Sequence, residues 1–121
     1  MIKAIPVINC TEPEFYETMR QSELGDNWYH WHAANPDFFA LFEKFTAEAI
    51  SMGHKALSGW LIVNRVRWET NVVTKGGEFK ISNNYISLFA RLYMIRNPQY
   101  VGFFKTNRMK SLANDVFNPI I

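Results

Sequence analysis

The chain has 121 residues, and 48% of them are hydrophobic, with ten Phe, five Tyr and four Trp among them. This length fits one domain, and so apolar a composition excludes an intrinsically disordered chain. The single cysteine, Cys10, excludes an intramolecular disulfide, and no apolar run approaches the ~18 residues that span a membrane. An N-terminus interrupted by Pro6 and Asn9 is not a signal peptide, so we expect a cytoplasmic protein.

The net charge of +2 hides an unequal distribution. Up to His54 there are three basic and eight acidic residues, a net charge of −5. From Lys55 onward there are ten basic and three acidic residues, a net charge of +7. Such a split indicates an anionic partner for the second half of the chain. It is equally compatible with an acidic half that covers the basic half within one fold.

Residues 1–34 are predicted to form an extended N-terminal arm. The arm has room for one short acidic helix, with Thr11 as its N-cap, Pro13 in its first turn and Gly25 at its end.

The candidate metal ligands of the chain are its three histidines and one cysteine. In an extended "WYHWHAAN" segment, alternation places Trp28, His30 and His32 on one side of the chain. A zinc or iron site would need a third ligand, for which Glu12, Asp37 and His54 are the candidates. Because the neighbours are aromatic, packed histidines are the favoured interpretation, and no metal site is predicted.

The strongest helical pattern spans 36–52. Asn35 is a suitable N-cap, Pro36 suits the first helical position, and Gly53 is a natural stop. Apolar residues at helical spacing predict one buried face: Phe38, Leu41, Phe42, Phe45, Ala49 and Met52.

A second helix is predicted from Ser58, its N-cap, to about Glu69. The run "WLIV" within it leaves a strand as the competing interpretation. The residues expected to supply its apolar contacts are Trp60, Leu61, Ile62, Val66 and Trp68.

A hairpin and a third helix follow. "NVVTKGGEFKI" reads as a short β-hairpin because Gly76-Gly77 can adopt the positive φ of tight turns. Ser82 is then expected to cap a helix over 83–96, which ends before Asn97-Pro98. The predicted fold is therefore mainly α with a short hairpin, a three-helix domain over 35–121 that resembles a helix-turn-helix or winged helix.

That fold leads to the first functional hypothesis, a module that binds double-stranded DNA. At the start of the third helix, Asn83 and Asn84 are expected to read bases, because an amide matches adenine N6 and N7. The alternative is that serine and asparagine at this position are ordinary helix caps. The residues expected on phosphates are Lys75, Lys80, Arg91, Lys105, Arg108 and Lys110.

Catalysis is not predicted. Cys10 has no base nearby in the sequence, and the chain contains no nucleophile-elbow, P-loop or dinucleotide-binding pattern. We therefore expect no cofactor and no enzymatic activity.

Several short motifs resemble those of a family of small uncharacterised bacteriophage and prophage proteins. They are "HAANP" (32–36), "RWE" (67–69), "FK" (79–80), "NNY" (83–85), "AR" (90–91) and "FFKTNR" (103–108). The resemblance implies a viral or mobile-element origin and carries no activity with it.

This origin supports a second hypothesis, an inhibitor that binds and blocks a host defence or regulatory protein. Its aromatic patch would be "NWYHWH", although that segment is better explained as a cover for the first predicted helix. A homodimer is left open.

Overall fold

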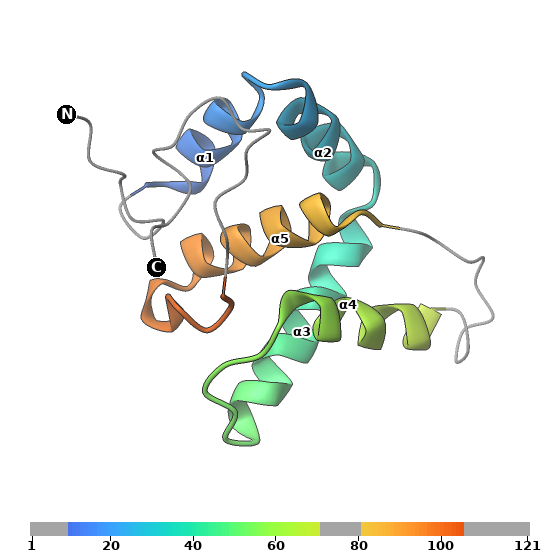
Figure 1. The fold of residues 1–121 in the computed structure, drawn as a ribbon, viewed down its shortest axis with the longest axis vertical. Coiled ribbons are helices and arrows are strands. Elements are labelled where there is room, and N and C mark those ends of the chain that lie inside the picture. The colour runs from blue at the N-terminus through green and yellow to red at the C-terminus, as the bar shows by residue number, and fades with distance from the viewer. Residues whose placement is uncertain (1–9, 71–80, 106–121) are drawn as a thin grey trace.

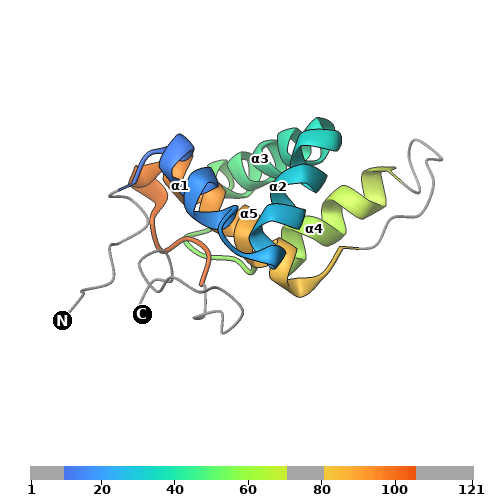
Figure 2. The same cartoon turned by 90° about the horizontal axis from the view of Figure 1, so that it is seen from above.

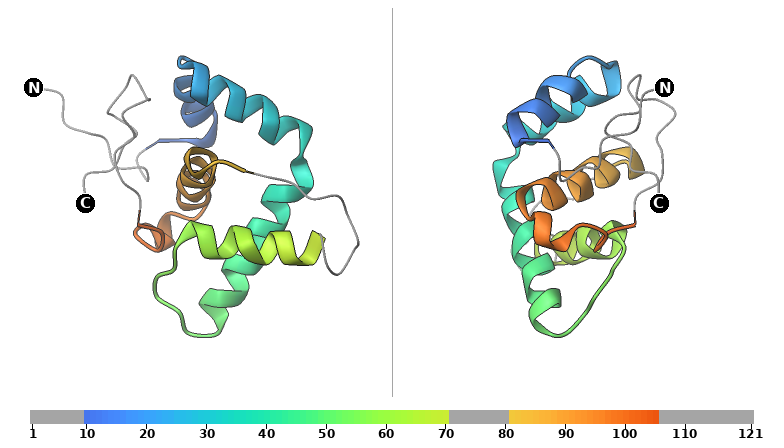
Figure 3. Two further views of the ribbon diagram at one scale, coloured as in Figure 1. Left: turned by 45° about the vertical axis from the view of Figure 1, so that its right-hand side comes forward. Right: turned by 90° about the vertical axis from the view of Figure 1, so that its left-hand side faces the viewer.

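The computed structural model describes residues 10–70 and 81–105. The helices in these residues are α1 (Glu12–Met19), α2 (Glu23–Ala34), α3 (Pro36–Ser51), α4 (Gly59–Trp68), α5 (Asn83–Arg96) and the short 3₁₀ helix η3 (Pro98–Tyr100). Helix α5 lies in the middle, with α1 and α2 on one side and α3 and α4 on the other (Figure 1; Figure 3). It packs directly against α1, α4 and η3.

Side-chain caps set the starts of four helices. Thr11 and Glu14 form a capping box at α1, in which each side chain bonds the backbone N–H of the other residue. Ser22, Ser58 and Ser82 cap α2, α4 and α5, each accepting a hydrogen bond from the backbone N–H three residues on. Short-range capping interactions in the sequence thus determine where these four helices begin.

The predicted winged-helix arrangement is wrong. Residues 10–70 and 81–105 contain five α-helices, not three, and no strand. The predicted hairpin around Gly76-Gly77 falls on residues 71–80, outside the described part of the chain. The difference arises because the first 34 residues contribute two helices, so that the third predicted helix becomes the centre of the bundle.

The prediction of an extended N-terminal arm is also wrong for Glu12–Ala34, which form α1 and α2. Their apolar side chains Phe15, Met19 and Trp28 are buried in the core. The alternation of histidine and tryptophan suggested an extended segment. The same residues also include a pair four apart, Trp28 and His32, which is a helical spacing. In α2 that spacing stacks Trp28 on His32, with ring centroids 5.6 Å apart.

Gly25 does not end a helix, as the sequence had suggested. Helix α1 ends at Met19, and Gly25 lies in the first turn of α2. A Cβ at this position would lie 2.6 Å from the carbonyl carbon of Met19. The glycine therefore permits the close approach of the end of α1 to the start of α2.

The three longest predicted helices are confirmed as α3, α4 and α5 within one or two residues at each end. Gly53 follows α3 with a φ of +97°, as a helix stop does. Asn35, however, is not a side-chain cap of α3. Its Nδ2 donates instead to the carbonyl oxygen of Trp31 at 2.9 Å, so Asn35 closes the end of α2.

The core is largely aromatic, and the Phe89 ring of α5 lies at its centre. Its closest ring is Phe38 of α3, with centroids 4.8 Å apart. The rings in contact with Phe89 come from α2 and α3: Trp28, Trp31, His32, Phe38, Phe39 and Phe42. Aromatic packing thus joins the helix pairs on the two sides of α5.

Candidate functional site

The two asparagines predicted to read bases lie in the first turn of α5, and both are exposed. The cap of this helix is Ser82, so neither Asn83 nor Asn84 is needed for capping. Lys105 is also exposed, but it follows the opposite end of α5, which is about 20 Å long. The structure therefore does not bring Lys105 beside the asparagines.

Arg91 was predicted to contact phosphate, and that prediction is wrong. Its relative exposure is 0%, and its Nη1 donates to the carbonyl oxygen of Ser87 at 3.1 Å and to the Ser87 hydroxyl. Burial lowers the pKa of this guanidinium to about 10. The remaining predicted phosphate contacts, Lys75, Lys80, Arg108 and Lys110, lie outside the described residues.

Helix α5 cannot act as a recognition helix along its length. Every residue from Leu88 to Ile95 is buried, because other helices cover α5 on both sides. A helix that enters the major groove needs one open face over several turns. Apart from Arg96 at its end, the exposed residues of α5 are those of its N-terminal turn.

Part of the positive charge of the second half of the chain is paired with carboxylates of the first half within the fold. Arg65 Nη1 of α4 lies 3.6 Å from Glu48 of α3, and its Nε lies 3.2 Å from Glu69. Arg96 Nε of α5 lies 2.6 Å from Glu12 of α1, and its Nη1 lies 2.9 Å from Glu43 of α3. Both arginines therefore balance carboxylates of the acidic half.

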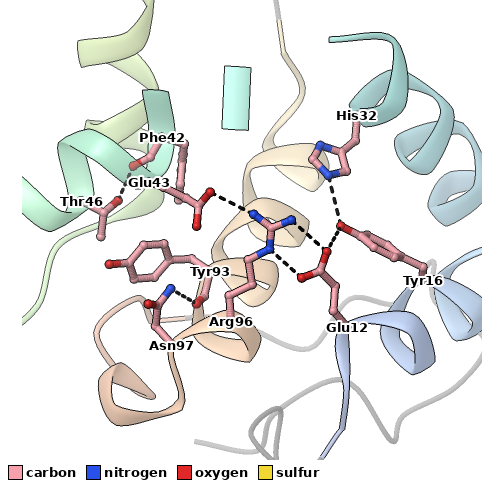
Figure 4. Close-up of polar contacts among 9 residues, drawn as sticks. All are labelled: Glu12, Tyr16, His32, Phe42, Glu43, Thr46, Tyr93, Arg96 and Asn97. Carbon is pink, nitrogen blue, oxygen red and sulfur yellow. Dashed lines mark hydrogen bonds and ion pairs between the residues drawn. The ribbon is translucent and has the colours of Figure 1, made fainter. Parts of the chain in front are cut away.

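Arg96 belongs to a polar cluster that joins α1, α2, α3 and α5 (Figure 4). The Tyr16 hydroxyl donates to Glu12 Oε2 at 2.8 Å and lies 3.2 Å from His32 Nε2. Hydrogen bonding to Arg96 lowers the pKa of Glu12, whereas burial lowers the pKa of His32, and the charge of Arg96 lowers it further.

This cluster fits a structural clamp better than a catalytic site. Both carboxylates are occupied by Arg96, whose own pKa is raised above its usual value chiefly by the hydrogen bonds to Glu12. His32 Nδ1 is buried and has no hydrogen-bond partner, and the ring stacks on Trp28. Aromatic packing thus accounts for the position of His32, as the sequence had favoured.

The metal-site geometry considered from sequence is absent. On a helix, two residues separated by one point to different sides, so His30 and His32 do not converge. Among the described residues, no three His, Cys, Asp or Glu side chains are grouped as they would be around a metal ion.

A cleft of about 270 Å³ lies between the α2–α3 junction and the end of α4. Trp31, Phe38 and Val66 are among its apolar lining residues, and Asp37 and Thr70 are among its polar ones. The Thr70 hydroxyl donates to the carbonyl oxygen of Val66, so it is already used within the fold.

The most unusual surface lies on α4. Its buried side carries Ile62, Val63 and Val66. Its opposite side exposes Trp60 by 58%, Leu61 by 49% and Trp68 by 59%. We call the surface formed by Trp60, Leu61, Asn64, Arg67 and Trp68 the outer face of α4. Helix α4 runs along one flank of the bundle, and its C-terminal end projects outward (Figure 2).

This surface was not predicted from the sequence, where Trp60, Leu61 and Trp68 were expected to supply apolar contacts of the helix. The sequence does contain a signal for it. Apolar residues occur on all sides of α4, and because a helix at a bundle surface buries only one stripe, some of them must be exposed. The predicted aromatic patch "NWYHWH" is instead part of the interior at Trp28, which is fully buried.

No family model, curated protein or solved structure matches this chain. None of the helices in residues 10–70 and 81–105 has the length and apolar character needed to cross a bilayer.

Proposed function

We propose that this protein is a non-catalytic protein-binding module and that the outer face of α4 is its docking surface. The observation that carries the proposal is the exposure of two tryptophans and a leucine on the side of α4 that faces away from the core. Tryptophan is enriched among the residues that dominate binding energy at protein interfaces. Exposed apolar residues gathered on one helix face are typical of such a site.

The charge arrangement supports a protein partner over a nucleic acid. Arg65 and Arg96 are held by carboxylates of the fold, and Arg91 is buried. These three arginines are therefore poor candidates for the phosphate contacts that give DNA-binding proteins most of their affinity.

The resemblance to phage and prophage proteins narrows the class of partner. Small phage proteins without catalytic residues often bind and block a host protein, and an exposed aromatic helix face suits that role. Under this proposal the partner is a host defence or regulatory protein.

The test is affinity capture of host-lysate proteins by the wild-type chain and by a Trp60→Ala/Trp68→Ala double variant. A specific partner should bind the wild type and lose at least tenfold in affinity with the double variant, since each tryptophan is expected to contribute about 1 kcal/mol or more. Met52→Ala is the matched control, because Met52 is 72% exposed but lies outside α4. Capture that is unchanged in the double variant would contradict the proposal.

Duplex DNA binding remains the second candidate, because Asn83 and Asn84 are exposed and free of capping. If it operates, affinity for mixed-sequence duplex should fall steeply between about 50 and 200 mM salt. An Asn83→Ala/Asn84→Ala variant should then lose sequence preference more than total affinity. Absence of binding at the lowest salt would remove this candidate.

A further inference from the structure

The cleft at the α2–α3 junction is formed where three helices approach one another. Asn35 is the single residue that joins α2 to α3. Trp31 and Phe38 line the cleft from the two sides of this corner, and Val66 and Thr70 line it from the end of α4. Its volume of about 270 Å³ is close to the ~300 Å³ at the lower end of the range for small-molecule sites. The cleft is thus large enough for a small organic molecule.

The apolar wall of the cleft is held in place by the core. The Trp31 ring packs in T-shaped contacts against Phe38 and Phe89, with centroids 5.3 and 5.8 Å apart. Phe38 and Val66 are buried, and Trp31 and Leu41 are half-buried. A wall that is already ordered lowers the entropy cost of binding, because few side chains must be fixed around the ligand.

The polar groups of the cleft are mainly hydrogen-bond acceptors. The carboxylate of Asp37 has no hydrogen bond or ion pair with any described residue. Asn35 Nδ2 donates to the carbonyl oxygen of Trp31 at 2.9 Å, and its Oδ1 remains an acceptor. The Thr70 hydroxyl donates its hydrogen to the carbonyl oxygen of Val66 at 3.0 Å. These groups favour a ligand that brings N–H donors.

The charge of the cleft has the same preference. The described residues that line it include one carboxylate and no Lys or Arg. Asp37 lies in the first turn of α3, where the helix dipole supplies about half a positive charge. The full negative charge of the carboxylate exceeds that half charge, so the corner stays net negative and suits a cation.

We propose that this cleft binds a small organic ammonium ion with an apolar body. The ammonium group pairs with Asp37, and its three N–H donors match the acceptors of the cleft. Trp31 adds to this attraction, because tryptophan is the best aromatic partner of a cation. The apolar body contacts Phe38, Leu41 and Val66.

The ligand is a free small molecule and not a side chain of the protein that binds α4. Val66 belongs to the buried side of α4, whereas the outer face lies on the opposite side of the helix. A partner bound to Trp60 and Trp68 is therefore separated from the cleft by the helix itself. The site goes beyond the proposed function and does not depend on it.

Three probes that share a phenyl ring test the preference for positive charge: phenethylammonium, phenethyl alcohol and phenylacetate. Phenethylammonium should bind with a dissociation constant on the order of 1–10 mM, as expected for so small a ligand. It should bind about threefold or more tighter than the alcohol, within the range for one exposed charge pair, and phenylacetate should bind weakest.

The ¹⁹F resonance of Trp31, in the chain labelled with 5-fluorotryptophan and assigned with Trp31→Phe, reports on the cleft directly. It should shift with phenethylammonium, while the resonance of Trp60, at the other end of α4, stays fixed. No shift of Trp31 up to about 50 mM ligand would overturn the proposal. So would equal affinities of the ammonium ion and the alcohol, or tighter binding of phenylacetate.

Asp37→Asn tests the role assigned to the carboxylate, since it removes the charge at almost constant size. Asp37 is exposed, so the variant should keep the fold, which circular dichroism checks. Phenethylammonium and the alcohol should then bind with affinities within about 1.5-fold of each other. Glu23→Gln removes a carboxylate from the first turn of α2, outside the cleft, and should leave the wild-type preference. A preference for the ammonium ion that survives in Asp37→Asn would contradict the proposal.

Discussion

Helix α5 and helix α4 both begin at a serine cap and both carry many apolar residues, but their surroundings differ. On α5, every residue from Leu88 to Ile95 is buried, including Arg91. On α4, Ile62, Val63 and Val66 are buried while the opposite side exposes tryptophan and leucine. Within the described residues, one helix is enclosed by its neighbours and the other is covered on one side only.

The difference teaches where function is to be sought. An apolar helix face that the fold covers contributes to stability, and its residues need no further explanation. A comparable face left in water costs solubility and is typical of an interaction site. The α5 asparagines attract attention in the sequence, but among the described residues the α4 tryptophans are the large apolar side chains that stay exposed on a helix.

The largest expected contrast between the two helices is in stability. Phe89→Ala in α5 should lower the free energy of unfolding by about 3–5 kcal/mol, because the ring is fully buried among aromatic neighbours. Leu61→Ala in α4 should change it by less than about 0.5–1 kcal/mol, since this side chain is half exposed. Urea denaturation of both variants measures the difference, and similar losses would mean that the α4 face is packed in solution.

The next effect concerns the close contact between the end of α1 and the start of α2, which pack on one side of α5. Gly25→Ala should destabilise the fold by about 1–3 kcal/mol, because the added Cβ would collide with the backbone of Met19. Gly53→Ala is the comparison. An alanine there would be strained by the positive φ, but no atom lies near the added Cβ. Thermal denaturation should show the larger drop in melting temperature for Gly25→Ala. The reverse order would mean that the close approach of Gly25 to Met19 does not determine how α1 and α2 pack.

A smaller effect is expected at the clamp on the end of α5. Arg96→Ala should lower the free energy of unfolding by about 1–2 kcal/mol, because it leaves the half-buried Glu12 and Glu43 without their partner. Arg20→Ala, which breaks the exposed pair with Asp26 and the contact of the guanidinium with the Tyr29 ring, should cost less than about 1 kcal/mol. A loss at Arg96 no greater than that at Arg20 would show that the clamp does not hold α5.

The smallest effect is a dependence on pH. The pKa of His32 lies below its ordinary value, so the folded state favours the neutral ring, and stability is lost as pH falls below about 6.5. His32→Gln should flatten the dependence of the melting temperature on pH between pH 7 and 5.5. The lowered pKa of Glu12 acts in the same direction but only at more acidic pH. A slope that survives in His32→Gln would assign the effect to another group.

Local patterns predicted much of the helical content. Serine caps, a proline in the first turn and glycine stops mark helix ends through short-range chemistry, so α3, α4 and α5 could be located from sequence. The same rules identified Thr11 as the start of α1. They did not separate α1 from α2, because the role of Gly25 depends on a contact between two helices.

The environment of each helix could not be predicted in the same way. Arg91 carries a charge, and its burial depends on which helices surround α5. Trp60 and Trp68 are apolar, and their exposure reflects that none of the helices in residues 10–70 and 81–105 covers that side of α4. Both are properties of the tertiary arrangement, and neither residue type indicates them on its own.

The most direct test of the account is a ¹⁹F NMR titration of the chain labelled with 5-fluorotryptophan, which gives one resonance for each of the four tryptophans. The account predicts that the Trp60 and Trp68 resonances shift when a captured partner protein is added, while the resonances of the buried Trp28 and the half-buried Trp31 stay fixed. Shifts confined to Trp28 and Trp31, or no shift in any resonance, would contradict the claim that the outer face of α4 is the interaction surface.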